Sequence, residues 1–515
     1  MWNVVTPLRA EGLRPPQGTH LAKCWASIGE SDIPGLFLIK EKSMKIYNTL
    51  TRRKEELVPM EPNHIKMYVC GPTVYDYFHL GNARPFVTYD TLRRYLEHKG
   101  YQVTYVQNFT DIDDKMINRA NEEGTTVKEL ADRMIEEYFH DADALNIKRA
   151  DHHPRATENI DEIIELISLL EEKGFAYVTS DGVYFEIAKD PEYGKLSGKR
   201  IEDLEAGASE RVASNEDKKS PLDFSLWKFK KEGEPAWPSP WGEGRPGWHI
   251  ECSAMSRANL GDTIDLHAGG VDLVFPHHEN EIAQSENATG KPFVRYWMHN
   301  GFINIDKEKM SKSKGNFFLV RELAKIYPYQ VIRFFMLQAH YRMPINFEKD
   351  SLDAAVASWN RMTTCVNNLL YVAKTAPEKA ADQEAMQAAT QLKEAITEAE
   401  EAWDRGLSDD LNTADAIAAI FDLVRAANIA ACVPGIPKGA LMAAYDKLIS
   451  ILDVLGLNPT ESESSIPADI MDLVDRRQEA KKVRDFNLAD SLRDEITAAG
   501  YKVEDTPQGT KVTKA

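Results

Sequence analysis

The hydrophobic and polar positions in the first half of the chain predict strands that alternate with helices. Apolar residues at 67–70 suit a buried strand, which Gly71 and Pro72 interrupt. Residues 85–95 place their apolar side chains at helical spacing, and residues 103–109 form a second apolar run. This order predicts an α/β fold built on a parallel sheet.

Helical patterns dominate the second half of the chain. Residues 351–457 are a run of Ala-rich and Leu-rich segments, which is typical of a helix bundle. Cys365 and Cys432 fall on these helices, and we expect both to be buried as small apolar side chains. Residues 470–499 then predict two further helices, and residues 500–512 a hairpin.

Composition narrows the class of protein. The chain has 515 residues, of which 43% are hydrophobic and 28% charged, as in an ordinary multidomain soluble protein. Five cysteines in this length do not make a disulfide framework, so we expect a cytoplasmic protein. No uncharged apolar run approaches the roughly 20 residues of a membrane span.

The net charge of −19 argues against a protein that binds nucleic acid regardless of sequence. Any contact with nucleic acid must therefore use local basic stretches. Candidates are residues 195–200, 228–231, 307–314 and 476–484, although each of them also fits a solvated surface.

The first candidate motif is His-Leu-Gly-Asn at residues 79–82, between the first predicted strand and helix. In an open α/β sheet, ligands bind at this crossing, where backbone N–H groups and a helix N-terminus face an anion. His79, Gly81 and Asn82 would then lie at a phosphate. Four residues are a weak match, and an ordinary turn explains them equally well.

The second candidate motif is Lys-Met-Ser-Lys-Ser at residues 309–313, followed by Lys-Gly-Asn. Its ammonium groups could offset the charge that develops on a leaving pyrophosphate. Taken alone, a solvated basic loop explains this segment better. In this order and around a nucleotide-type fold, however, the two motifs resemble those of class I aminoacyl-tRNA synthetases.

Three further features are similar to cysteinyl-tRNA synthetases. Cys70 stands shortly before the first motif, Gly-Arg-Pro-Gly-Trp-His-Ile-Glu-Cys ends at Cys252, and Phe-Pro-His-His-Glu-Asn-Glu spans residues 275–281. The resemblance runs from about Met44 to the C-terminus. It implies a Rossmann-type parallel-sheet catalytic domain with an insertion, then an α-helical bundle and a small C-terminal α+β module.

The domain boundaries that we expect follow from this resemblance. Residues 1–43 are an extension with no counterpart in the family, which we expect to be poorly ordered. The predicted domains are the catalytic domain at 44–345 with an insertion at about 151–246, a tRNA-binding helical bundle at 346–457 and a small anticodon-binding module at 466–515.

The resemblance also implies the roles of individual residues. His79, Lys309 and Lys312 would act in catalysis. The residues expected to bind ATP are His79, Asn82, Gly270, Asp272 and Lys312. Those expected to bind cysteine are Gly71, Thr110, Trp248 and His267.

Cys70, Cys252, His277 and Glu281 are all residue types that bind Zn²⁺. A helix starting near Pro276 would place His277 and Glu281 on one face, whereas His278 has Ile282 four residues on. Without the resemblance, buried cysteines and a capped histidine would explain these residues better. With it, we expect one zinc ion per chain, which would favour a cysteine thiolate over the hydroxyl of serine.

The resemblance implies a cysteine–tRNA ligase. Such an enzyme activates L-cysteine with Mg²⁺-ATP and transfers it to the 3′ end of tRNA(Cys), and we expect it to act as a monomer. The C-terminal module would contact the anticodon, although Val512 stands where bacterial relatives often have Trp. Whether the insertion contacts the tRNA stays open.

Two alternatives remain. An ATP-dependent cysteine ligase that acts on a small amine, as in mycothiol synthesis, would share the catalytic motifs. It would have no use for residues 470–515. A non-catalytic tRNA-binding paralogue would not need the full set of ATP and metal residues.

Overall fold

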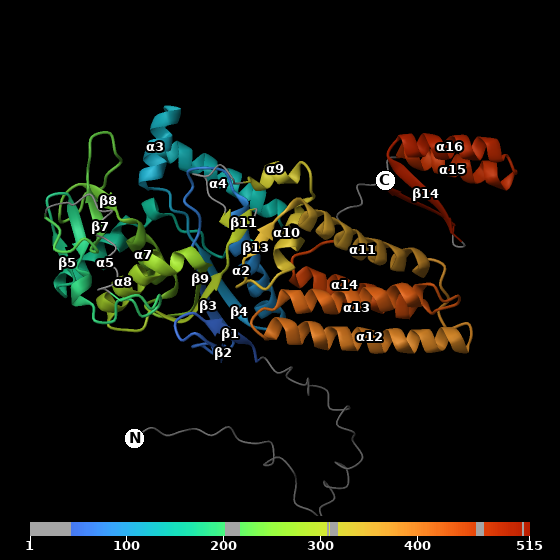
Figure 1. The fold of residues 1–515 in the computed structure, drawn as a ribbon, viewed down its shortest axis with the longest axis horizontal. Coiled ribbons are helices and arrows are strands. Elements are labelled where there is room, and N and C mark those ends of the chain that lie inside the picture. Colours follow the sequence, from blue (N-terminus) through green and yellow to red (C-terminus); the bar gives the residue numbers. More distant parts are fainter. Residues whose placement is uncertain are drawn as a thin grey trace, which may run out of the picture. The chain divides into compact units, whose positions relative to one another are not determined.

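The computed structural model describes residues 43–200, 217–305, 308–309, 318–459, 468–506 and 509–514 (Figure 1). The predicted extension lies, apart from Ser43, outside these described residues. The same holds for most of the second motif, including Lys312.

A four-stranded parallel sheet forms the centre of the catalytic region. Its strands are β3 (His64–Val69), β4 (Gln102–Gln107), β9 (Ile264–Gly270) and β10 (Val294–Asn300), in the order β10-β9-β3-β4. Every pair is parallel. The predicted strands at 67–70 and 103–109 correspond to β3 and β4, and the α/β class with a parallel sheet is confirmed.

The helix after β3 begins earlier than its hydrophobic pattern indicated. α2 (Leu80–His98) starts five residues before Pro85, which lies inside it. The reason is a cap: His79 has an extended backbone, and its Nδ1 accepts a hydrogen bond from the N–H of Asn82 at 3.2 Å. The first motif is therefore the cap and first turn of a helix.

Other elements surround this sheet. The hairpin of β1 (Lys45–Asn48) and β2 (Arg53–Glu56) precedes β3. The remaining helices here are α3 (Asp114–Glu123), α4 (Val127–Ala144), α7 (Trp248–Leu260), η4 (Val271–Leu273), η5 (Val274–His278) and α8 (Glu279–Thr289).

Residues 151–246 contain an antiparallel sheet with the strand order β5-β6-β7-β8. Its buried residues, such as Ile163 and Trp227, form one core with Ile250 of α7 and Ala283 of α8. The elements are η2 (Ala156–Glu158), α5 (Ile160–Glu172), β5 (Ala176–Val178), β6 (Gly182–Phe185), η3 (Ile187–Lys189), β7 (Phe224–Phe229) and β8 (Gly244–Pro246).

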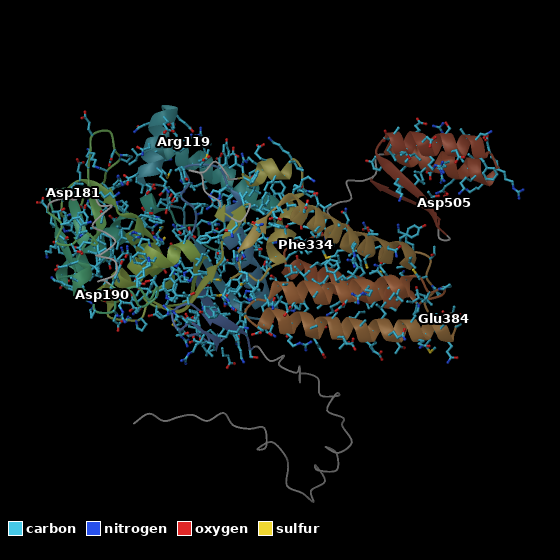
Figure 2. The ribbon with its side chains drawn as sticks, in the orientation of Figure 1. Arg119, Asp181, Asp190, Phe334, Glu384 and Asp505 are labelled. Atoms are coloured by element: carbon cyan, nitrogen blue, oxygen red, sulfur yellow. The ribbon has the colours of Figure 1, made fainter. Side chains whose placement is uncertain are left out.

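A three-stranded sheet connects the catalytic region to the bundle. It has the order β12-β11-β13, with β11 (Ile303–Ile305), β12 (Glu308–Lys309) and β13 (Ile345–Phe347). α9 (Val320–Ala324) and α10 (Tyr329–Leu337) lie between β12 and β13 in the sequence. Phe334 of α10 is fully buried (Figure 2).

The bundle consists of α11 (Lys349–Ala373), α12 (Gln383–Ser408), α13 (Thr413–Ala431) and α14 (Lys438–Val454), side by side in Figure 1. Its core is continuous with that of α2 and β3. Cys365 is buried as predicted, but the prediction for Cys432 is wrong, because this residue caps the end of α13 and is exposed.

The C-terminal module contains α15 (Ala468–Lys482), α16 (Phe486–Ala498), β14 (Tyr501–Thr506) and β15 (Gly509–Lys514). The two strands pair antiparallel, on either side of the predicted turn. Ile470, Val474 and Ile496 form its small core. Over the described part of the chain, no helix is long and apolar enough to cross a membrane.

Candidate active site and metal centre

A pocket of about 330 Å³ opens at the carboxyl end of β3. Its walls come from the segment after β3, the first turns of α2, the start of α7, the turn after β9 and the end of β10. Eight of the predicted site residues line it: Cys70, Gly71, His79, Gly81, Asn82, Trp248, Gly270 and Asp272.

Hydrogen bonds to the segment that follows β4 fix the pocket wall beside Gly71. The N–H of Gly71 donates to Asn108 Oδ1 at 2.8 Å, and the N–H of Val74 donates to the carbonyl of Thr110 at 3.1 Å. A Cβ on Gly71 would lie 1.7 Å from the carbonyl oxygen of Asn108, so only glycine fits. Thr110 is buried directly behind this wall.

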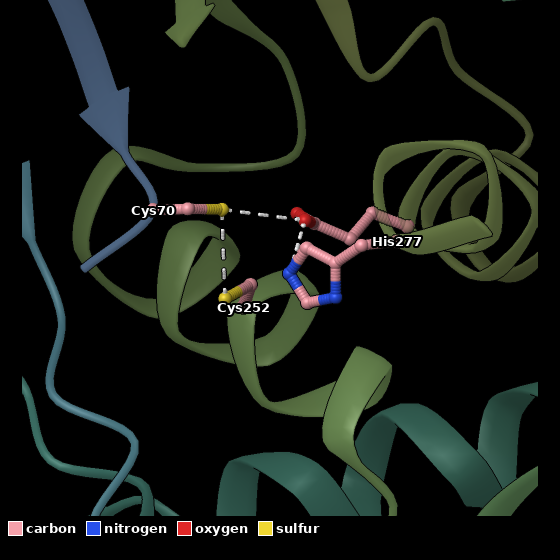
Figure 3. Close-up of side chains that lie close together, drawn as sticks. Cys70, Cys252 and His277 are labelled. Atoms are coloured by element: carbon pink, nitrogen blue, oxygen red, sulfur yellow. Dashed lines mark hydrogen bonds and ion pairs between the residues drawn. The ribbon is translucent and has the colours of Figure 1, made fainter. Parts of the chain in front are cut away.

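Cys70, which lines the pocket, also belongs to a cluster of four side chains (Figure 3). The ligand atoms of Cys70, Cys252, His277 and Glu281 all lie within 4.8 Å of one another. Cys70 follows β3, Cys252 lies on α7, and the other two come from η5 and α8. The Cys70 and Cys252 sulfurs are 3.8 Å apart, so they are not a disulfide.

These separations suit a tetrahedral Zn²⁺, whose ligand atoms lie about 3 to 4 Å apart, given bonds of about 2.0 to 2.3 Å. Cys70 Sγ is 3.6 Å from Glu281 Oε1, which is 3.0 Å from His277 Nε2. All four residues are buried. Burial raises the pKa of both the Glu281 carboxyl and the Cys70 thiol, and a divalent cation would offset the cost of ionising them.

The short spacing between His277 and Glu281 depends on where the helical backbone begins. Phe275 is extended, with φ −142° and ψ 131°, and the helical backbone starts after it and continues into α8. The two side chains are therefore one turn apart on the same face, as predicted. The same geometry stacks the ring of His277 on Trp248 at the pocket wall, with 4.3 Å between centroids.

The helix end that carries the first motif forms another wall of this pocket. His79 and Asn82 line it from the cap and first turn of α2. Gly270 and Asp272 line it from the turn after β9, where a Cβ on Gly270 would lie 2.6 Å from Asp272 Oδ1. The backbone of Lys309 lies in β12.

Comparison with known proteins decides the family. The model of the class I tRNA synthetase (C) catalytic domain matches residues 56–357, and a DALR domain matches residues 402–458. A cysteine–tRNA ligase of Caldicellulosiruptor saccharolyticus is 55% identical over 473 residues, covering 92% of this chain and 100% of the relative. That of Clostridioides difficile is 52% identical over 472 residues, covering 91% and 99%. The chain belongs to the cysteine–tRNA ligases.

The fold agrees with this assignment. Mycobacterium tuberculosis methionyl-tRNA synthetase in complex with methionyl-adenylate superposes with a TM-score of 0.57 at 17% identity, over 80% of this chain and 94% of that one. Membership of the cysteine–tRNA ligases confirms the predicted ligase function and the class I catalytic fold. The alternative of a mycothiol-type ligase is not favoured.

The sequence did not single out every residue around Cys70 in this cysteine–tRNA ligase. His278 Nε2 lies 3.3 Å from Cys70 Sγ, and His267 Nε2 lies 3.4 Å from it. Cys70, His267, His278 and Glu281 thus form a second group that could hold a metal. His267 is fully buried.

His278 was not predicted as a ligand because the residue that it contacts, Cys70, is distant in the sequence. A ligand pair within one helix is spaced four residues apart, whereas Cys70 approaches His278 from a distant segment. Behind it, His278 Nδ1 lies 2.7 Å from His299 Nε2, and His299 Nδ1 lies 2.7 Å from Thr49 Oγ1. No motif in the sequence marks His299 or Thr49.

Proposed function

We propose that the pocket and the metal cluster form one active site, in which cysteine is activated by ATP and then transferred to tRNA(Cys). The observation that carries this proposal is that Cys70 belongs to both: it lines the pocket and supplies a ligand atom to the cluster. A cysteine bound with its sulfur at the cluster would place its carboxylate in the pocket. His79 and Asn82 lie in the wall of that pocket.

Cys70, Cys252, His277 and Glu281 would hold one Zn²⁺. Bound zinc would supply a soft Lewis acid that ionises and binds the thiol of the substrate in preference to a hydroxyl. A pocket that separates such similar side chains by size alone gains only about 1 to 3 kcal/mol. Trp248, His267, Gly71 and Thr110 would enclose the cysteine.

In the first step, a carboxylate oxygen of cysteine attacks the α-phosphorus of Mg²⁺-ATP, and pyrophosphate leaves with the electron pair of the broken bond. In the second step, a ribose hydroxyl at the 3′ end of the tRNA attacks the carbonyl carbon, and AMP leaves. His79 and Asn82 hold the phosphates, and Lys309 and Lys312 offset the charge on pyrophosphate. Asp272, beside Gly270, would accept a hydrogen bond from the ribose of ATP.

The C-terminal module would contact the anticodon. Val512 is partly buried against the small core of the module. Phe486, the first residue of α16, is 61% exposed, and Lys482 and Arg484 precede it by four and two residues in the sequence. An exposed aromatic ring on a basic segment suits the stacking of a single-stranded base.

For the insertion, the structure favours a packed domain over a tRNA contact made by its lysines. Lys228 pairs with Asp114 at 2.6 Å, and Lys230 pairs with Glu243 at 3.1 Å. Each of these two ammonium groups has a carboxylate partner within the chain. Because a single chain supplies all the proposed site residues, and because the few cysteines fit a reducing compartment, we propose a monomer in the cytoplasm.

The test is charging of a tRNA(Cys) transcript with labelled cysteine, with ATP–pyrophosphate exchange measured in parallel. We expect both activities with cysteine and neither with serine. Exchange without charging would move the acceptor to a small amine. An enzyme that shows no exchange with cysteine would contradict the proposed site.

A further inference from the structure

Arg84 is a buried cation in α2, five residues after His79. It is 1% exposed, and within the described part of the chain no carboxylate lies at ion-pair distance from it. Its guanidinium donates instead to four backbone carbonyls. Nη1 donates to Gly301 at 2.8 Å and Phe302 at 2.5 Å, and Nη2 donates to Tyr341 at 3.1 Å and to Met343.

These carbonyls belong to two segments that are distant in sequence. Residues 301–302 join β10 to β11, and residues 341–343 lead from α10 to β13. The segments pass closely, since a Cβ on Gly301 would lie 2.7 Å from the carbonyl oxygen of Arg342. Arg84 therefore closes a junction between α2, β11 and β13, which lie together in Figure 1.

The junction connects the two ATP motifs. α2 carries His79 and Asn82 at its N-terminal end, and β11 pairs with β12, where Asn304 faces Lys309. Lys309 is the first residue of the second motif in the sequence. The hydrogen bonds from Arg84 to the carbonyls of residues 301–302 lie between these two motifs.

Burying the charge of an arginine at this position costs free energy. Such a residue is expected here only if the shape of its guanidinium group has a role. Burial lowers the pKa of Arg84 to about 10, so the side chain stays charged at neutral pH without a counter-ion. An apolar side chain would fill the same space with no such cost. The rigid planar fork of a guanidinium, however, can hold carbonyls from two segments at fixed positions, which an ammonium group cannot do.

We propose that Arg84 is a positioning residue for adenylate formation, which fixes the strand leading to Lys309 against the helix end that carries His79 and Asn82. Adenylate formation requires groups from both motifs at one triphosphate. A displacement of about 1 Å between such groups can lower a rate by about 10²-fold. The inference rests on the ATP site proposed above.

The test compares Arg84→Lys with a matched control, Arg333→Lys. Arg333 of α10 is also fully buried, and it holds the distal half of α2 through Asp90 at 2.5 Å and the carbonyls of Leu145 and Leu455. Both variants lose part of a buried guanidinium network. Only Arg84→Lys disturbs the junction between the ATP motifs.

We expect the two variants to melt at similarly reduced temperatures and to keep the zinc content of the wild type. In ATP–pyrophosphate exchange, the kcat of Arg84→Lys should fall by about 10- to 100-fold with an unchanged KM for cysteine. Arg333→Lys should keep the wild-type kcat. A normal kcat in Arg84→Lys, or equal losses in both variants, would overturn the inference.

Asp410→Asn provides a second route if Arg84→Lys does not fold. Asp410, in the turn between α12 and α13, holds the same segment from its other side, through Tyr341 Oη at 2.8 Å and Arg342 Nη2 at 2.7 Å. A loss of kcat at unchanged KM for cysteine is expected there too, and a folded variant with normal kcat would count against the inference. If the wild type itself shows no exchange, the proposed function fails instead.

Discussion

Cys252 supplies one of the two sulfur atoms of the proposed zinc site, and the hydrogen bond from Cys70 lowers its pKa. This hydrogen bond favours the thiolate form, which metal binding requires. A serine hydroxyl at this position would bind zinc poorly.

We predict that Cys252→Ser loses zinc and the preference for cysteine over serine together. Metal content and the ratio of cysteine to serine activation are the measurements. Cys365→Ser is the control, because Cys365 is buried among the bundle helices, where its Sγ contacts the carbonyl of Val424 at 3.7 Å. Stoichiometric zinc in Cys252→Ser would refute the ligand set.

Lys312 belongs to the second motif in the sequence. We predict that Lys312→Ala lowers adenylate formation by about 10² to 10³-fold, because one cationic group is lost where charge develops. Zinc content should stay normal. Lys325→Ala is the control, since Lys325 is an exposed lysine that pairs with Glu322 on α9. Near-normal exchange in Lys312→Ala would contradict its role.

At the scale of elements, one carboxylate joins the C-terminal hairpin to its helix. Asp505 of β14 accepts two hydrogen bonds from Arg477 of α15, at 2.8 and 2.7 Å, and pairs with Lys481 (Figure 2). These cations hold the pKa of Asp505 well below its usual 3.8. The stabilisation is therefore complete above about pH 4 and is lost as the carboxylate is protonated at lower pH.

We predict that the protection factors of the β14 and β15 amide protons fall at pH 3 by more than those of the rest of the chain. Asp505→Asn should lower the free energy of local opening of the hairpin by up to about 1 kcal/mol already at pH 7. The effect is no larger because the ion pair is partly exposed. Hydrogen exchange of the full chain measures it. Asp472→Asn, which removes an exposed pair with Arg476 at 3.7 Å, should change little. Equal exchange in both variants would contradict the role of Asp505.

At the scale of the whole molecule, the catalytic pocket and the module proposed to contact tRNA are built on separate hydrophobic cores. The pocket is built on the core shared by the catalytic sheet and the bundle, whereas residues 468–514 have their own small core. We predict that removing residues 460–515 leaves ATP–pyrophosphate exchange within about twofold of the wild type. Charging efficiency should fall on the order of 10²-fold, because base stacking and phosphate contacts are lost.

Phe486→Ala in the full chain should reproduce part of that loss as a raised KM for tRNA. Leu488→Ala provides the control, since Leu488 is an exposed apolar residue in the same region without an aromatic ring. Undiminished charging by the truncated chain would show that the module is dispensable.

Periodicity and motif chemistry identified much of this protein. The alternation of apolar runs predicted β3 and β4, and the helical spacing predicted most of α2 and the bundle, because such patterns report which side of an element is buried. The two ATP motifs and the Cys, His and Glu segments were sufficient to indicate the cysteine–tRNA ligase family. The four-residue separation of His277 and Glu281 predicted that they lie one helical turn apart.

Tertiary structure decided the rest. The start of α2 depends on a histidine cap that no apolar pattern marks, and the exposure of Cys432 depends on where α13 meets the surface. Cys70 approaches Cys252 and His278 only because the sheet brings their segments together. The same is true of the hydrogen bonds from Arg84 to two distant segments. A sequence records which side chains can bind a metal or a carbonyl, but the distances that let them do so are set by packing between elements far apart in the chain.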